Sequence, residues 1–149
     1  MNFLQIIFLL SISAVFALME IQIEGTGGWA ENLPTWKVKN PFRKILGWPT
    51  LLDGYHFWMW VLMMLIFHSP FFFGFAFNLT NELLVIEMFL FFAVIEDFLW
   101  FVFNPGWGIK KFFTREIPWH PRKIMFLPQN YWLSFVIITI FEIFKNTIG

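Results

Sequence analysis

ELLVIEMFLFFAVIEDFLWFVF, residues 82–103, is apolar except for four acidic side chains, Glu82, Glu87, Glu96 and Asp97. Its length matches the roughly 20 residues that an α-helix needs to cross the hydrocarbon core of a bilayer. Residues 104–108 (NPGWG) end it, because proline and glycine there cannot continue a helix. The stretch therefore predicts a transmembrane helix that carries acidic groups at membrane depth.

The composition of the whole chain favours the same class of protein. Of its 149 residues, 58% are hydrophobic and 13% are charged, whereas a soluble domain has about 25% charged residues. A soluble domain of this size leaves much of its chain at the surface, and that surface could not hide 23 Phe and 9 Trp residues. We therefore expect an all-α integral membrane protein in which residues 1–149 form a single domain.

Four segments have the length and apolar character of membrane spans. They are residues 2–23, residues 51–77 with a kink at Pro70, residues 82–103 and residues 129–148. Pro70 removes one backbone hydrogen bond within the second segment, and Thr50 followed by Asp53 is typical of a helix start. The first segment has no preceding Lys or Arg and is long for a signal peptide, so we expect a retained helix.

The two long connections, residues 24–50 and 104–128, combine Trp and Pro with four and five Lys or Arg residues, respectively. Tryptophan favours the headgroup level of a membrane, and basic residues favour the cytoplasmic side. Four spans put both connections on one side, as this rule requires, whereas three spans would separate them. We expect interfacial connections in the cytoplasm and both chain termini outside.

This topology brings carboxylate and imidazole groups from separate segments to one depth in the cytoplasmic leaflet. A charge inside the bilayer costs at least ~2.5–3.5 kcal/mol and usually faces a partner or a cavity. Carboxylate and imidazole together suit Zn, Fe or Mn ions, and helical bundles build such sites from inward side chains. The candidate metal ligands are Glu20, Glu24, His56, Glu96, Asp97 and His120.

Glu20 and Glu24 are spaced as i and i+4, so the two like charges repel on one helix face. A proton on one of them, or a cation between them, would relieve that repulsion. The alternative is that they mark the wet end of the first segment and pair with Lys37 or Arg43.

The other candidates also have structural interpretations. Glu96 and Asp97 could pair with Lys110 or Arg115. His56 and His120 could lie at the membrane interface without binding a metal ion. Asp53 is better interpreted as a first-turn helix acid, and Glu116 reaches the same level from the second connection.

The acids expected near the outer side have simpler interpretations, with one exception. Glu82 suits the positive end of a helix dipole, and Glu142 can pair with Lys145 at i+3. Glu87, about a turn and a half into its helix, has no such explanation.

The sequence lacks the residues or motifs that several functional classes require. The chain has no Cys, which excludes thiolate chemistry and Cys-ligated metal centres. Ten basic and ten acidic residues cancel, so there is no basic surplus for nucleic acid. No Glu-x-x-His pair occurs, which disfavours a di-iron carboxylate bundle.

Three hypotheses remain. The first is a metal-dependent protein that acts at the inner lipid interface, and the acids at membrane depth favour it. The second is a non-catalytic subunit or scaffold with a membrane-protein partner. The third is a proton or ion pathway formed by a homo-oligomer, with Glu87 and Glu96 at two depths. The sequence specifies no substrate or reaction.

Overall fold

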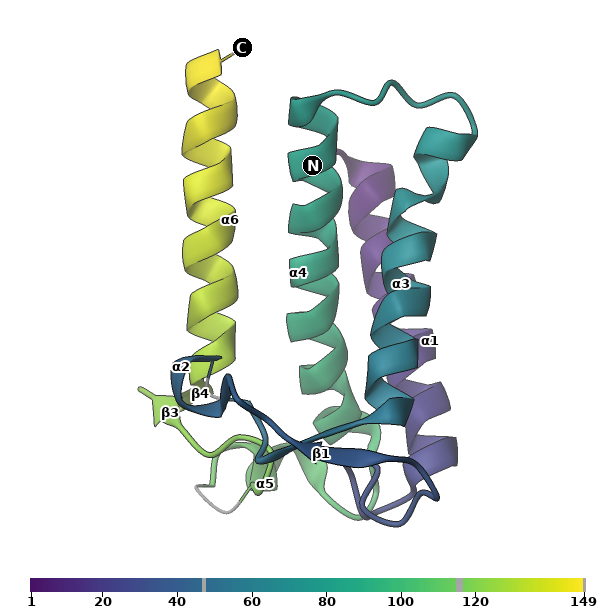
Figure 1. The fold of residues 1–149 in the computed structure, drawn as a ribbon, viewed down its shortest axis with the longest axis vertical. Coiled ribbons are helices and arrows are strands. Elements are labelled where there is room, and N and C mark those ends of the chain that lie inside the picture. The colour runs from purple at the N-terminus through teal and green to yellow at the C-terminus, as the bar shows by residue number, and fades with distance from the viewer. Residues whose placement is uncertain (47, 115–116, 149) are drawn as a thin grey trace.

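The computed structural model describes residues 1–46, 48–114 and 117–148, which are mostly helical. Its long helices are α1 (Phe3–Glu24), α3 (Gly54–Phe72), α4 (Leu79–Phe103) and α6 (Gln129–Ile148). The connections between α1 and α3 and between α4 and α6 lie together across one end of these helices (Figure 1). We call this the covered end. Arg115 and Glu116 lie outside the described residues.

The connections contain two short antiparallel sheets that the sequence did not predict. One pairs β1 (Lys37–Lys39) with β2 (Leu51–Asp53), and the other pairs β3 (Lys123–Ile124) with β4 (Leu127–Pro128). Two short helices, α2 (Arg43–Leu46) and α5 (Gly108–Phe112), complete this layer. The polar backbone of the connections is therefore partly hydrogen-bonded within the layer.

The central helix is α4, against which α1, α3 and α6 all pack. Ser13 and Ala17 lie one turn apart on α1 and are both fully buried. Such small side chains allow two helix backbones to approach closely. Away from the covered end, an apolar cluster that includes Phe16, Met63 and Phe89 fills the space between α1, α3 and α4.

The predicted limits of the second helical segment, residues 51–77, were wrong at both ends. Residues 51–53 form β2, so α3 begins at Gly54, and Asp53 rather than Thr50 caps it by accepting from the His56 N–H at 3.0 Å. The helix ends at Phe72, beyond Pro70, which lies within it. Because Pro70 has no N–H for the Ile66 carbonyl, the Ser69 hydroxyl donates to that carbonyl instead, at 2.7 Å.

The other segments agree more closely with the prediction. Helix α1 spans Phe3–Glu24, with an Asn2 capping box, and α6 spans Gln129–Ile148. Helix α4 begins three residues early, at Leu79, because the Asn78 side chain accepts from the Asn81 N–H and starts the helix there.

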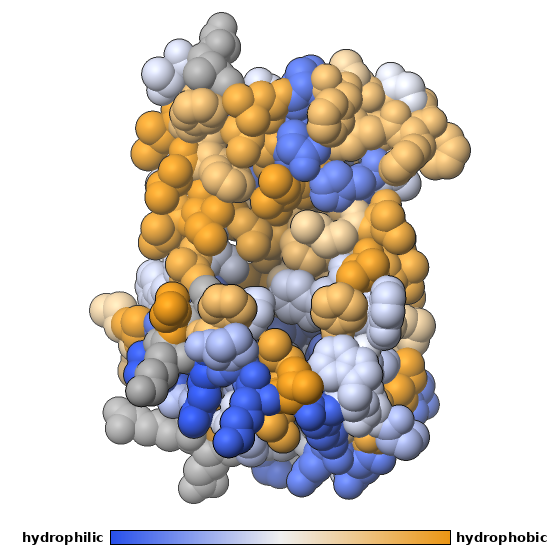
Figure 2. Space-filling model, in the orientation of Figure 1, coloured by the Kyte–Doolittle hydropathy of each residue, from blue (hydrophilic) through white to orange (hydrophobic). Residues whose placement is uncertain are grey.

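One helix of the described residues, α1, is long and apolar enough by itself to cross a membrane. The four acids of α4 lower its apolar character, as do the His, Ser and Pro residues of α3. Large apolar side chains are nevertheless exposed on all the long helices, and Figure 2 shows them over much of one face. Four membrane spans remain our proposal for this arrangement.

Single cysteines test the proposed topology without background labelling, because the chain has none of its own. Val38 and Ile124 are exposed in the two connections, and Phe77 is exposed at the opposite end. With four spans, Val38→Cys and Ile124→Cys react with an impermeant maleimide from the cytoplasmic side, and Phe77→Cys reacts from outside. Reaction of Val38→Cys and Ile124→Cys from opposite sides would contradict the proposal.

Candidate metal centre

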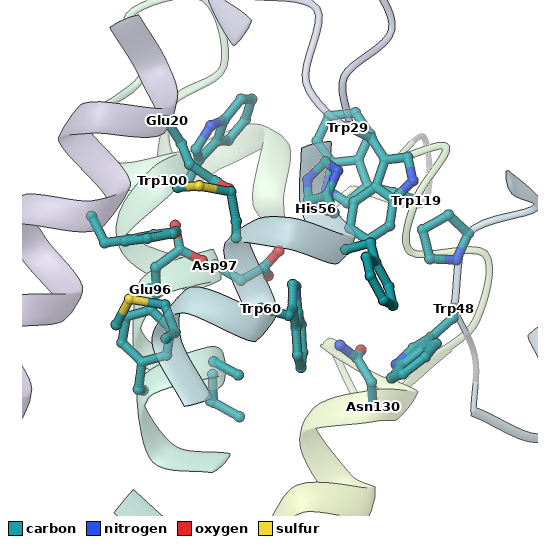
Figure 3. Close-up of a pocket in the computed structure, with 18 of the residues that line it drawn as sticks. Glu20, Trp29, Trp48, His56, Trp60, Glu96, Asp97, Trp100, Trp119 and Asn130 are labelled. Atoms are coloured by element: carbon teal, nitrogen blue, oxygen red, sulfur yellow. The ribbon is translucent and has the colours of Figure 1, made fainter. Parts of the chain in front are cut away.

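All six candidate ligands lie on the wall of one cavity at the covered end. The cavity has a volume of about 450 Å³. It is lined by α1, α3, α4 and α6 and by residues of the two connections, which include Trp48 and Pro49. This volume is within the range of about 300–1,000 Å³ that is usual for small-molecule sites. Figure 3 shows Glu20, His56, Glu96 and Asp97 around it, together with tryptophans that include Trp29, Trp100 and Trp119.

Glu20, Glu24 and His56 form the tightest group. Each offers one ligand atom, and these three atoms lie within 4.8 Å of one another. The His56 Nε2 atom is 3.5 Å from Glu24 Oε1. Ligands bound to one ion at about 2.0–2.2 Å lie at most about 4.4 Å apart, so a small inward movement would bring all three into the first coordination shell.

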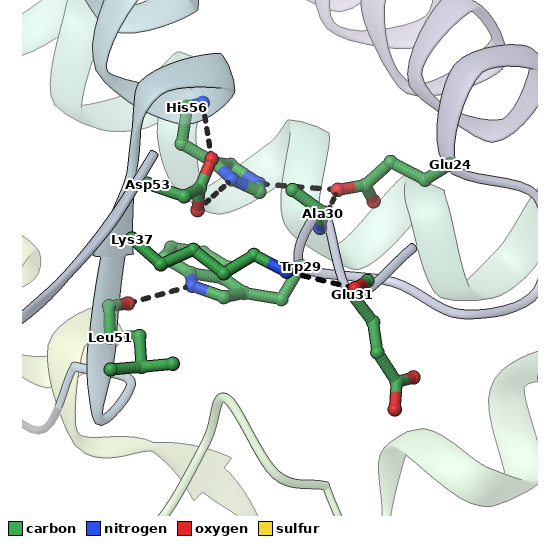
Figure 4. Close-up of polar contacts among 8 residues, drawn as sticks. All are labelled: Glu24, Trp29, Ala30, Glu31, Lys37, Leu51, Asp53 and His56. Carbon is green, nitrogen blue, oxygen red and sulfur yellow. Dashed lines mark hydrogen bonds and ion pairs between the residues drawn. The ribbon is translucent and has the colours of Figure 1, made fainter. Parts of the chain in front are cut away.

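Asp53 orients the imidazole of His56. Its Oδ2 accepts from His56 Nδ1 at 2.8 Å, and its Oδ1 accepts from the His56 N–H. With its proton on Nδ1, the ring directs the Nε2 lone pair toward Glu24 (Figure 4). A carboxylate on the far nitrogen is the usual support of a metal-binding histidine. The sequence predicted Asp53 as a first-turn acid behind a Thr50 cap, whereas Asp53 is itself the cap of α3 and also supports His56.

The loop after α1 holds the group from the other side. The Trp29 ring stacks on the His56 ring, with centroids 4.0 Å apart and planes at 15°. The Ala30 N–H donates to the Glu24 carboxylate. Trp29 and Ala30 adopt φ values of 46° and 48°, which cost an L-residue roughly 1–2 kcal/mol each. Such backbone conformations cluster at functional sites, and they also occur in turns, as at Met125 and Phe126 between β3 and β4.

Glu96 and Glu20 both line the cavity, and the charge of each acts on the other. One carboxyl oxygen of Glu96, Oε1, is buried and has no hydrogen-bond partner among the described residues. Glu96 therefore stands next to the three-residue group and could supply a further oxygen ligand.

Asp97 and His120 belong to a different cluster in the same cavity. Asp97 Oδ2 accepts from His120 Nε2 at 2.9 Å and from the Tyr131 hydroxyl. The other ring nitrogen of His120, Nδ1, is buried without a hydrogen-bond partner among the described residues. Lys123, near Asp97, donates to the Phe112 and Thr114 carbonyls, and burial lowers its pKa.

The outer acids have partners of their own. Lys145 lies 2.6 Å from Glu87 and 3.0 Å from Glu142, so the expected pairing of Glu142 with Lys145 is confirmed. His68 lies 3.1 Å from Glu82. Glu87, which the sequence left unexplained, therefore forms an ion pair between α4 and α6.

Sequence reasoning missed three members of this region. The i, i+3 spacing of Asp53 and His56 was a usable signal for their contact. Trp29 was interpreted only as a headgroup anchor, and Tyr131 received no role. Nothing in the local sequence indicated that the Tyr131 hydroxyl would bond to Asp97, which is 34 residues away.

No known protein family, curated protein or solved structure matches this chain. The arrangement of its own side chains therefore carries the functional argument.

Gly28 provides a test of how the loop packs on the site. It has a φ of +66°, and an added Cβ would lie 2.5 Å from the buried Trp119 ring. Gly108 has a similar φ, +71°, but nothing within 4 Å. We expect Gly28→Ala to lower the free energy of unfolding in detergent by about 2–4 kcal/mol. Gly108→Ala should cost only about 1–2 kcal/mol, and equal losses would contradict the packing of Trp119 on Gly28.

Proposed function

We propose that this chain is a four-span membrane protein that holds one divalent transition-metal ion with Glu20, Glu24 and His56. In the proposed topology the ion lies in the cytoplasmic leaflet, where the protein carries out metal-dependent chemistry at the lipid interface. The convergence of the three ligand atoms within 4.8 Å is the observation that carries this proposal.

The charge balance of the cavity supports a bound cation. Its described lining contains five carboxyl groups and two imidazoles but no Lys or Arg: Glu20, Glu24, Asp53, Glu96, Asp97, His56 and His120. Buried charges are costly unless they are paired or coordinate a metal. The Lys and Arg partners that a purely ion-paired scaffold would need are absent from this lining.

The contact between His56 and Glu24 also supports a bound cation. With Nδ1 donating to Asp53, a neutral His56 directs a lone pair at a carboxylate oxygen 3.5 Å away. A proton on Nε2 would satisfy Glu24 alone, whereas a metal ion would satisfy Glu24, Glu20 and the imidazole together. The metal ion therefore relieves more of the unfavourable contacts.

The ligand types indicate which ion fits. Carboxylate oxygen with imidazole nitrogen, and no thiolate, suits Zn, Fe or Mn. Three protein ligands leave at least one coordination position open, as in catalytic rather than structural metal sites. An ion bound there would act as a Lewis acid toward a carbonyl group or lower the pKa of a bound water.

The contacts of Glu87 do not favour the ion-pathway hypothesis. It required Glu87 as a proton or ion carrier at another depth, but Glu87 is engaged by Lys145 at 2.6 Å. The scaffold hypothesis offered Lys37 or Arg43 as a partner for the acids of α1, and of these two Lys37 donates to the Glu31 carbonyl.

Elemental analysis of gently purified protein tests the metal proposal. We expect about one transition-metal ion per chain, loss of that ion in Glu24→Ala and His56→Ala, and weaker retention in Glu96→Ala. Glu82→Ala is the matched control, because Glu82 contacts His68 at the opposite end of the helices, and it should keep the metal.

Circular dichroism would establish that each variant retains its helices. Wild-type protein that holds no Zn, Fe or Mn, even after incubation with each ion, would contradict the proposal.

A further inference from the structure

The cavity changes character along its length in the same direction on every long helix. Its wall is polar at the covered end and apolar farther along: Glu24 to Phe16 on α1, His56 to Met63 on α3, Asp97 to Phe89 on α4, and Asn130 to Ile137 on α6. At 1.5 Å per residue, seven or eight residues correspond to about 10–12 Å. One cavity therefore offers a polar end and an apolar channel of that length.

The apolar part lies over α4 between α3 and α6. Figure 2 shows that the surface is hollowed there, between the apolar side chains of the flanking helices. Trp48 and Trp60 line this side with their ring centroids 6.0 Å apart, and Asn130 faces them from α6 (Figure 3). In the proposed topology this hollow faces the bilayer, so a lipid-soluble molecule can enter sideways.

A second cavity of about 390 Å³ lies under the polar end, among the connections. It shares Trp29, Pro49, Asp53 and Trp119 with the first cavity. These residues form the wall between the polar end of the first cavity and a chamber lined by Thr26, Glu31 and Lys37.

We propose that the first cavity binds a single-chain amphiphile with an uncharged hydroxyl or carbonyl head. The tail lies along α4 between α3 and α6, and the head lies beside Asp97 and His120. The volume of about 450 Å³ is in the lower part of the range for small-molecule sites and suits one chain rather than two.

The lining carries acids without Lys or Arg, so an anionic head is repelled. The choice of an uncharged rather than a cationic head rests on the proposed metal ion, which already supplies positive charge. The binding of the tail in the apolar part of the cavity does not depend on that ion.

His120 supplies a specific contact for such a head. Its Nε2 is engaged by Asp97, and its Nδ1 is buried without a partner among the described residues. With the proton on Nε2, the Nδ1 lone pair can accept a hydrogen bond from a hydroxyl group. An alcohol head would satisfy this otherwise costly buried acceptor.

Photolabelling in lipid nanodiscs tests this inference. The probe is a long-chain alcohol with a diazirine at the far end of its tail, and mass spectrometry locates the labelled residues. We expect labels on Met63, Leu90 and Ile137, removed by excess unlabelled alcohol of the same length. An alkyl sulfonate of equal length, which is anionic and a poor metal ligand, should compete about tenfold more weakly, or about 1.4 kcal/mol.

Two tryptophan substitutions on α6 provide the matched pair. Ser134 lines the cavity, and Val136 is exposed on the same helix. Ser134→Trp should reduce the labelling about tenfold, whereas Val136→Trp should leave it unchanged. Labels confined to exposed positions such as Val136, or labelling that Ser134→Trp does not alter, would overturn the inference. Equal competition by the sulfonate would overturn the uncharged head.

Metal content measured in the same samples separates the two proposals. Specific labelling of a metal-free wild-type protein would sustain tail binding in the cavity and refute the proposed metal function. A stoichiometric metal ion in protein that shows no competed labelling would support the metal function and refute the binding of an amphiphile in the cavity.

Discussion

The contact of His56 with two carboxylates, Asp53 on Nδ1 and Glu24 facing Nε2, is the constraint on which the covered end depends. It ties the end of α1 to the start of α3. It also requires the loop after α1 to turn back, so that Trp29 stacks on the imidazole and Ala30 donates to Glu24. Buried ionisable groups are costly to leave unpaired, so this segment is specified by electrostatics as much as by apolar packing. A metal ion would complete the group rather than rearrange it.

Helix α4 serves two polar clusters because adjacent residues on a helix point about 100° apart. Glu96 faces Glu20 and the proposed ion, and Asp97 faces His120 and Tyr131. One side of the cavity is therefore suited to holding a cation, and the other to holding or moving a proton. Both lie at the polar end of an apolar channel, an arrangement that suits chemistry on the head of a lipid-soluble molecule.

Local sequence signals predicted most of the helices and six of the residues that line the cavity. The limits of α1 and α6 follow from apolar length, and the six candidate ligands from counting depth along each segment. The start of α3 could not be predicted in this way, because Leu51–Asp53 pair with Lys37–Lys39 across a long connection. The pairing of Glu87 with Lys145 and the bond from Tyr131 to Asp97 likewise depend on how α6 packs against α4. Sequence spacing carries no information on such contacts between separate helices.

X-ray absorption at the metal edge, recorded on the protein in nanodiscs, tests the central claim most directly. The account predicts nitrogen and oxygen ligands at about 2.0–2.2 Å, with the outer-shell scattering of one imidazole. That imidazole signal should disappear in His56→Ala and persist in His68→Ala, since His68 lies at the other end of α3. Identical spectra from wild-type protein and His56→Ala, or a wild-type spectrum of a hydrated ion without imidazole, would contradict a metal centre at Glu20, Glu24 and His56.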